Sequence, residues 1–90
     1  MDAILLAQDS HAFGHMFRAE RKALGKKQGD VAAAVGTRRQ TIADLESGKN
    51  VGSHIVFAAL AALGKRVAIT SAGRPDPETM RAMMEALGDD

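Results

Sequence analysis

The side chains best suited to chemistry lie together near the middle of the chain, in Thr37–Ser47. Only Ile42, Ala43 and Leu45 are apolar there, and Ile42 and Leu45 are three residues apart, so they can anchor one face of a helix. The other faces carry polar and basic residues: Arg38, Arg39, Gln40, Thr41 and Asp44. A helix with a narrow apolar anchor and a polar, partly basic N-terminal half is typical of helices that read the major groove of DNA.

A short helix and a glycine turn precede this polar stretch. Three apolar residues of the short helix share one face: Val31, Ala32 and Val35. Gly36 is then the usual left-handed stop, because glycine has no Cβ that clashes in that conformation. We expect the Thr37 hydroxyl to cap the second helix and Gln40 to reach back to the Thr37 amide. Gln28–Gly48 is therefore predicted to form two short helices joined by a tight turn.

This stretch resembles the helix-turn-helix of the XRE-type family, the group of the phage repressors and Cro. The resemblance rests on residues at fixed spacing: Gln28, Ala32, Val35-Gly36-Thr37, Ile42, Leu45-Glu46 and Gly48-Lys49. It extends from His11 to Gly64. Lys27 departs from the family pattern, which has threonine there to cap the first of the two helices. Gln28 or water is therefore expected to take the first amides of that helix.

The resemblance implies a lambda-repressor-like, all-α fold of four to five helices that binds double-stranded DNA without a cofactor. The family places its base-reading residues at Arg38, Arg39, Gln40 and Asp44. Arginine matches N7 and O6 of guanine, and glutamine matches N7 and N6 of adenine, unless Gln40 serves only as a cap. The Asp44 carboxylate would be repelled by nearby phosphates unless it accepts a hydrogen bond from cytosine N4 or orients an arginine. Phosphate contacts, which fix register only, are expected from Lys27, Gln28, Thr41, Ser47, Lys49 and Asn50.

A first helix is predicted from Asp9 or Ser10 to about Leu24, before Gly25. Its apolar face would consist of Phe13, Met16, Phe17 and Leu24. The family pattern implies that Arg21 on this helix pairs with Glu46. The pair would tie this helix to the helix over Thr37–Ser47, which is the family's recognition helix. The alternative is two solvated side chains, because surface pairs contribute only about 0–1 kcal/mol.

The segment after the recognition helix predicts dimerisation. Ser53 is expected to cap a helix over Ile55–Leu63 that is apolar nearly all round and so needs two partners. Lys65–Thr70 alternates β-branched with other residues, as a strand does. Its partner would be Ala3–Ala7 or the same strand of a second subunit. A strand here resembles the HipB-like antitoxin branch, whose dimers are closed by a small intersubunit sheet. Expected dimer contacts are Phe57, Leu60, Val67 and Ile69.

The organisation predicted for the chain is an N-terminal arm over 1–10, a DNA-binding domain over 11–64, a dimerisation strand over 65–72 and a tail over 73–90. Ser71–Pro75 is a linker, and Asp76-Pro77 starts a tail helix. That helix carries an apolar stripe: Met80, Met83, Met84 and Leu87. Such a stripe suits adaptable contacts. It can dock a partner protein or fold back on its own dimer.

Composition narrows the function further. Residues 11–50 carry eight Lys/Arg against four acids, net +4, whereas residues 75–90 carry Arg81 against five acids, net −4. A basic body with an acidic tail suits an anionic partner on one surface. The chain has no cysteine, which agrees with a cytoplasmic protein. Ala3–Ala7 is too short for a signal peptide or a membrane span, so no membrane association is expected.

The sequence shows no pattern of residues that is typical of a catalytic or metal-binding site. His11 and His15 have a zinc-ligand spacing, but no third ligand is placed nearby, so no metal site is expected. There is no paired-carboxylate site and no glycine-rich phosphate loop after a strand. The chain is therefore expected not to be an enzyme, and no residue is assigned a catalytic role.

Three functions remain. The leading hypothesis is a homodimeric repressor that places two recognition helices ~34 Å apart on a pseudo-palindromic operator and regulates its own operon. The second, implied by the HipB-like resemblance, is an antitoxin that binds and inhibits a HipA-like kinase toxin. The third is an adaptor that binds other transcription proteins, and the basic Arg38-Arg39 pair argues against it.

Overall fold

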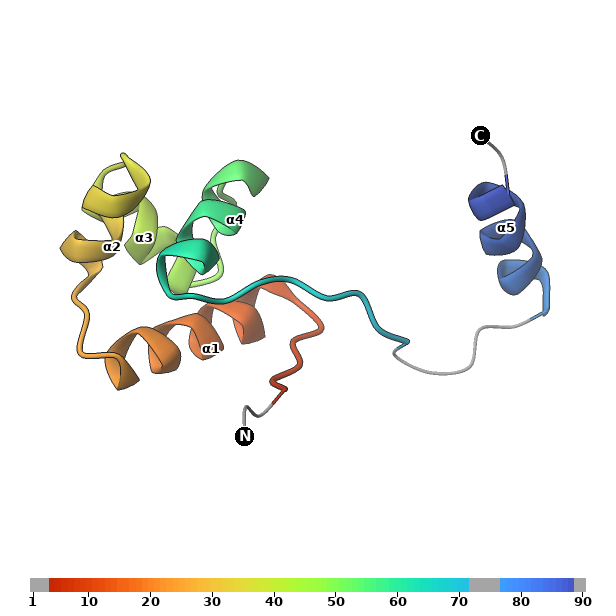
Figure 1. Cartoon of the computed structure of the whole chain (residues 1–90), viewed down its shortest axis with the longest axis horizontal. Helices are drawn as coiled ribbons and strands as arrows, with labels where there is room; N and C mark the ends of the chain where they lie inside the picture. The colour runs from red at the N-terminus through yellow and green to blue at the C-terminus, as the bar shows by residue number, and fades with distance from the viewer. Residues whose placement is uncertain (1–3, 72–76, 89–90) are drawn as a thin grey trace.

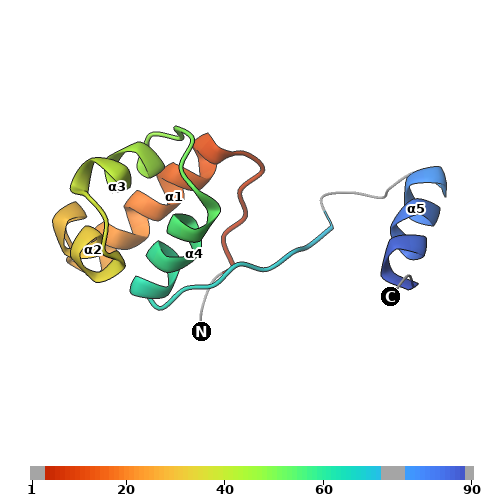
Figure 2. The same ribbon diagram turned by 90° about the horizontal axis from the view of Figure 1, so that it is seen from above.

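Four helices, α1 to α4, pack into one body, and a fifth lies apart from it (Figure 1). The computed structural model describes residues 4–71 and 77–88. The helices span α1 Ser10–Ala23, α2 Gln28–Val35, α3 Arg39–Glu46, α4 Ser53–Ala62 and α5 Pro77–Gly88. Figure 2 shows the four-helix body from above, with α3 beside α1 and α2. The all-α expectation is confirmed for the described residues.

Helix α1 begins where the sequence predicts. The Asp9 carboxylate accepts a hydrogen bond of 2.7 Å from the Ala12 amide and so caps the helix. Gly25 follows the helix with a φ of 70°, the left-handed conformation that favours glycine. Leu24, however, stands past the last turn and is exposed, so its expected place on the apolar face is wrong. Phe17 fills that face instead, with Phe13 partly buried beside it.

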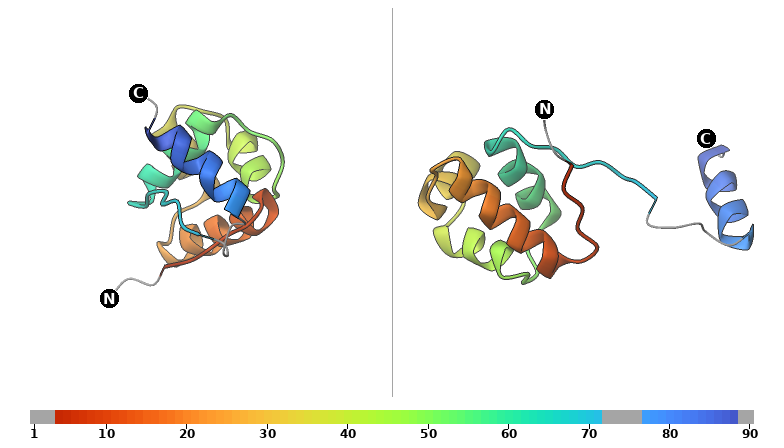
Figure 3. Two further views of the ribbon diagram at one scale, coloured as in Figure 1. Left: turned by 90° about the vertical axis from the view of Figure 1, so that its right-hand side faces the viewer. Right: turned by 90° about the horizontal axis from the view of Figure 1, so that it is seen from below.

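The core of the body joins one or two residues from each of the four helices. Its buried members are Phe17, Val31, Ala32, Ile42, Leu45, Ala59, Leu60 and Leu63. Burial of these side chains holds the short helices together, because helices of eight residues are marginal on their own. Figure 3 shows α1 lying across the body when it is seen from below.

Glycine at position 14 allows α1 to approach the end of α3 closely. A Cβ added there would lie 2.4 Å from the carbonyl oxygen of Glu46 and 2.6 Å from that of Leu45. Both atoms belong to the backbone, which cannot move aside as a flexible side chain can. Gly14 therefore sets the distance between α1 and the recognition helix.

The predicted dimerisation strand is not present, since the described residues contain no strand. Residues 65–71 form irregular backbone that leads away from α4 (Figure 1). Alternating side chains alone do not make a strand, because its backbone amides and carbonyls need a second strand as partner. Ala3, the first residue of the other candidate strand, lies outside the described residues, and residues 4–7 are irregular too.

Two further expectations about this region change. Ser53 does not cap α4 with its side chain; it is the first residue of the helix, and Gly52 takes the cap position. Leu60 is buried in the core of its own chain, so it is not free for a dimer contact. Phe57, by contrast, is 58% exposed on α4.

The tail helix α5 has no buried residue. It begins at Pro77, as the sequence predicts, while Asp76 and most of the predicted linker lie outside the described residues. Its apolar residues are exposed: Met80, Met83, Met84 and Leu87. In the described part of the chain, no helix combines the length and the apolar character needed to cross a membrane.

Candidate nucleic-acid interface

The turn between α2 and α3 places the start of the recognition helix. Gly36 has a φ of 81°, and both its amide and that of Thr37 donate to the carbonyl of Ala32 at 2.9 Å. The Thr37 amide is thus used to close α2. Helix α3 begins two residues later, with Arg38 at its cap position and no side-chain cap. The predicted capping box of Thr37 and Gln40 is therefore wrong.

Helix α3 turns its polar face away from the core. Ile42 is fully buried and Leu45 nearly so, and these two side chains fix the helix on the body. At about 100° of rotation per residue, Gln40 and Asp44 stand on the side opposite to them. Arg38, Arg39 and Gln40 are exposed, and Asp44 is partly so. The first turn of α3 therefore presents two guanidinium groups and an amide to solvent.

A buried ion pair joins α1 to the end of α3. Arg21 donates from Nε to Glu46 Oε2 at 2.6 Å and from Nη2 to Glu46 Oε1 at 3.1 Å. The two residues are only 7% and 6% exposed. Arg21 Nη1 also donates to the Lys26 carbonyl at 2.8 Å, and Gln28 Nε2 donates to Glu46 Oε1 at 3.1 Å. This network orients α3 from two sides, through α1 and through the first residue of α2.

The pKa of Glu46 reflects this network. Burial alone would raise the pKa, but the hydrogen bonds from Arg21 and Gln28 and the charges of Arg21 and Arg18 bring it below its ordinary value of 4.5. The hydrogen bond to Glu46 outweighs burial at Arg21 and raises the pKa of that guanidinium. Both groups are therefore charged at neutral pH.

We expect the ion pair to make the free energy of unfolding depend on pH in the acidic range. A carboxylate whose pKa is lower in the folded than in the unfolded protein stabilises the fold above the unfolded pKa, and this contribution is lost as pH falls through the folded pKa. The unfolding free energy of the wild type should fall as pH drops below about 4.5. Urea unfolding between pH 7 and pH 3 measures it. Glu46→Gln is the control, and a slope equal to that of the wild type would contradict a role for Glu46.

A basic hollow lies where α1, α2 and α3 meet. It is lined by Arg18, Arg21, Lys27, Gln28, Gly29, Asp30 and Arg39. Lys27 precedes α2, and its amide donates to the Asp30 carboxylate at 2.8 Å. The hollow thus gathers Arg18, Lys27 and Arg39, besides the paired Arg21, beside a helix N-terminus, a place that favours anions. Sequence reasoning missed Arg18, which only its place on α1 brings here.

The remaining phosphate candidates are Thr41 in the first turn of α3 and, after its last residue, Ser47, Lys49 and Asn50. Lys49 and Asn50 are exposed and Thr41 is partly buried. Ser47 Oγ donates to the Asp44 carbonyl at 3.0 Å, so its hydroxyl is engaged within the helix end. Lys49 Nζ lies 3.9 Å from Asp44 Oδ1. Ser47, Lys49 and Asn50 lie at the opposite end of α3 from Arg39, which lines the basic hollow.

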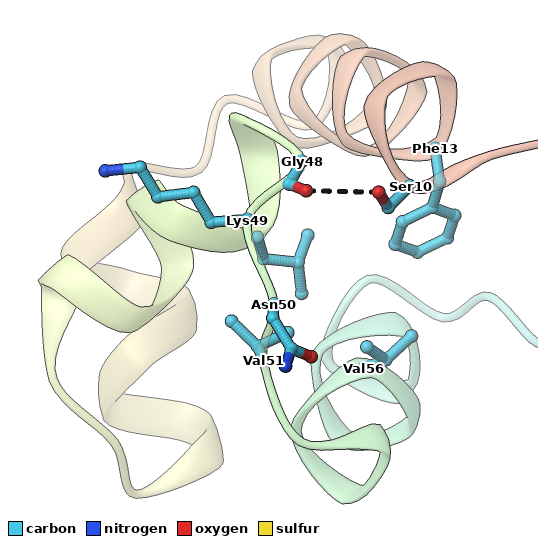
Figure 4. Close-up of a pocket in the computed structure, with 8 residues that line it drawn as sticks. Ser10, Phe13, Gly48, Lys49, Asn50, Val51 and Val56 are labelled. Atoms are coloured by element: carbon cyan, nitrogen blue, oxygen red, sulfur yellow. Dashed lines mark hydrogen bonds between the residues drawn. The ribbon is translucent and has the colours of Figure 1, made fainter.

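A second hollow lies beside the loop that follows α3 (Figure 4). It is lined by Ser10, Phe13, Leu45, Gly48, Lys49, Asn50, Val51 and Val56. Ser10 Oγ donates to the Gly48 carbonyl at 3.0 Å and ties the loop to α1. Figure 4 shows the Lys49 side chain extending away from Phe13 and Val56. The hydrogen bond therefore holds the loop against α1, while the Lys49 side chain points away from the hollow.

His11 and His15 lie in edge contact, with ring centroids 5.6 Å apart. Across the described ranges, no group of three or more His, Cys, Asp or Glu side chains is placed to hold a metal ion.

Several solved structures share the fold of this chain. A complex of a HipB variant with an O2 20-mer matches with a TM-score of 0.74 and 18% identity over 79% of this chain and all of that one (100%). An MDT protein matches at 0.72 with 18% identity, and a HipA-HipB-O2-O3 complex at 0.72 with 17% identity. Each covers 78% of this chain and 100% of its own. At this identity the likeness shows a shared fold.

Comparison with curated proteins finds no match. Among protein families, the Helix-turn-helix family matches residues 17–70, well over half of the chain. The match includes the buried anchor of α3, the glycine turn and the Arg21–Glu46 pair. The chain therefore belongs to the XRE-type helix-turn-helix family of DNA-binding regulators.

Proposed function

We propose that the protein is a sequence-specific DNA-binding repressor that acts as a homodimer on a pseudo-palindromic operator. The observation that carries the proposal is the arrangement of α3. Its apolar side is locked by Ile42 and Leu45, and its first turn offers Arg38, Arg39 and Gln40 to solvent. A rigid helix that presents such side chains can enter the major groove and bond to base edges.

The surroundings of α3 support the same function. Arg18, Lys27 and Arg39 gather at the start of the recognition helix, and Lys49 and Asn50 stand exposed beyond its end. Contacts from these residues to phosphates on either side would set the register of the helix without reading sequence. Gln28 contributes indirectly as well, because its amide holds Glu46.

A homodimer follows from the apolar surface that the chain leaves uncovered. Phe57 on α4 is 58% exposed, and Ala58 and Ala61 beside it are exposed too. Val67 is 47% exposed and Ile69 fully so, at 100%. A two-fold interface would cover these side chains in both subunits at once. It would also fix the spacing of the two recognition helices.

The test of this function separates base reading from phosphate binding. A duplex selected from a randomised library serves as the specific site, and a scrambled duplex as the control. Arg39→Ala should lose roughly 1–3 kcal/mol on the specific duplex only and relax selectivity at one base pair. Arg39→Lys, which keeps the charge but not the two-pronged donor, should also lose selectivity.

Lys49→Ala is the matched phosphate variant. It should weaken binding to both duplexes alike and lower the dependence of log affinity on log salt by about one. Equal losses on both duplexes for Arg39→Ala would show that Arg39 does not read a base.

A second candidate function is that of an antitoxin that represses its own operon and inhibits a HipA-like kinase toxin. The tail carries this candidate, because α5 is amphipathic and exposes its whole methionine stripe. The fold shared with the HipB of a HipA-HipB complex points in the same direction.

Deleting residues 75–90 tests the tail. If α5 docks a toxin of this kind, the truncated protein should keep nearly full operator affinity and lose capture of a HipA-like kinase. Binding titrations and a pull-down with that kinase measure the two properties. Loss of the dimer or of folding on truncation would place the stripe in the protein's own assembly instead.

A further inference from the structure

We propose that Asp44 is a positioning residue that fixes the side-chain amide of Gln40 as a reader of adenine. The inference rests on the proposed function, since it concerns how α3 reads one base pair. It starts from a contact within the recognition helix: Gln40 Nε2 donates to Asp44 Oδ1 at 2.9 Å. The two residues are four apart, so they are neighbours on the helix surface.

The contact decides which way the Gln40 amide faces. An ionised carboxylate only accepts hydrogen bonds, so it attracts the NH2 group of Gln40 and repels the amide oxygen. The oxygen is therefore directed away from Asp44. One N–H of the NH2 group is used by Asp44 and the other remains free, so Gln40 presents one acceptor and one donor side by side.

This pair of groups matches one base. Adenine offers an acceptor at N7 and a donor at N6 in the major groove, which complement the free N–H and the amide oxygen of Gln40. Guanine offers two acceptors, N7 and O6, so its O6 would oppose the amide oxygen. With the amide fixed, a site with adenine at this base pair is favoured over one with guanine.

The charge of Asp44 is compensated from the other side. Lys49 Nζ lies 3.9 Å from the same oxygen, Oδ1, that receives the bond from Gln40. The ammonium group offsets the repulsion that a carboxylate would meet near the DNA phosphates. Asp44 can therefore stand at the interface without contacting a base, which explains why an acidic residue is found on this helix.

The test uses Asp44→Asn, which has nearly the same shape but an amide that both donates and accepts. The Gln40 amide can then face either way. Wild type, Asp44→Asn, Gln40→Ala and the double variant are each used to select duplexes from a randomised library. Gln40→Ala identifies the base pair that Gln40 reads. At that base pair, Asp44→Asn should lower the preference for adenine about three- to tenfold. This loss is a part of the total discrimination that one two-bond contact provides.

Three further readouts distinguish positioning from other roles. The double variant should show the same preference as Gln40→Ala alone, because Asp44 acts only through Gln40. Affinity for scrambled duplex should not fall in Asp44→Asn, since a negative charge has been removed. In the free protein, the side-chain NH2 resonances of Gln40 should shift in Asp44→Asn.

Each contrary result has its own meaning. If Asp44→Asn changes the preference at a different base pair, or removes a preference for cytosine, Asp44 reads a base itself and the inference is overturned. If the variant keeps the full adenine preference, the inference is likewise overturned while the proposed function stands. A wild type that selects no sequence at all overturns the proposed function and this inference with it.

Discussion

Arg21→Leu is expected to destabilise the protein by about 3–5 kcal/mol, because it leaves the Glu46 carboxylate buried without its charged partner. Domains of this kind are stable by only about 5–15 kcal/mol, so the loss removes a large part of the total. Equilibrium urea unfolding at pH 7 measures it. Operator binding should fall in parallel, since the pair joins α1 to the recognition helix.

Two control variants make this result specific. Lys22→Ala removes an exposed cation from the next position of α1 and should change stability by less than about 0.5 kcal/mol. The double variant Arg21→Leu with Glu46→Leu removes both charges and should regain much of the loss, because apolar residues can replace a buried ion pair. If Arg21→Leu costs no more than Lys22→Ala, the pair does not hold α3 in place.

Phe57→Lys is expected to abolish the dimer and to lower affinity for the full operator by about a hundredfold or more. The reason is that joining two binding modules raises affinity by ~10²–10⁴ without any new contact, and separation of the subunits removes that gain. Phe57 is 58% exposed in the single chain, so the lysine should not disturb the core. Sedimentation at tens of micromolar and titrations on full and half sites measure the two effects.

Leu24→Lys provides the matched control. Leu24 is 48% exposed, close to the value for Phe57, but it is the residue that follows α1 and is not part of α4. This variant should remain dimeric and keep its preference for the full site. Val67→Lys tests the neighbouring apolar surface and should behave as Phe57→Lys does. A wild type that sediments as a monomer and binds half and full sites equally would contradict the dimer.

The sequence predicted the helices well because their ends depend on local chemistry. Asp9 caps α1 by itself, and Gly25 and Gly36 end helices in a conformation that disfavours other residues. The start of α3 was misplaced for a reason that is local too. Closure of α2 takes the Thr37 amide, so the next helix cannot begin there.

Features that depend on distances between helices could not be predicted from the sequence. The close approach at Gly14 exists only because α1 crosses the end of α3, and periodicity carries no information about such a crossing. Arg18 joins the basic hollow for the same reason. The alternation in Lys65–Thr70 records a potential for pairing, but whether a strand forms depends on a partner that the single chain does not supply.

The sequence allows Gln40 two local contacts, a capping box with Thr37 and a helical pair with Asp44. The two residues have the spacing of a helical pair, yet Gln40 was assigned to a capping box with Thr37. Once α3 begins at Arg39, the capping box has no place and the pair within the helix takes the amide.

The most direct test of whether α3 is the DNA-reading element is an NMR titration of the ¹⁵N-labelled protein with the selected duplex. This role of α3 predicts the largest amide shifts over residues 38–44 and at Lys27 and Gln28, with the scrambled duplex shifting the basic positions alone. Residues 77–88 should remain unchanged. Shifts confined to α4 or α5, with residues 38–44 unaffected, would contradict it.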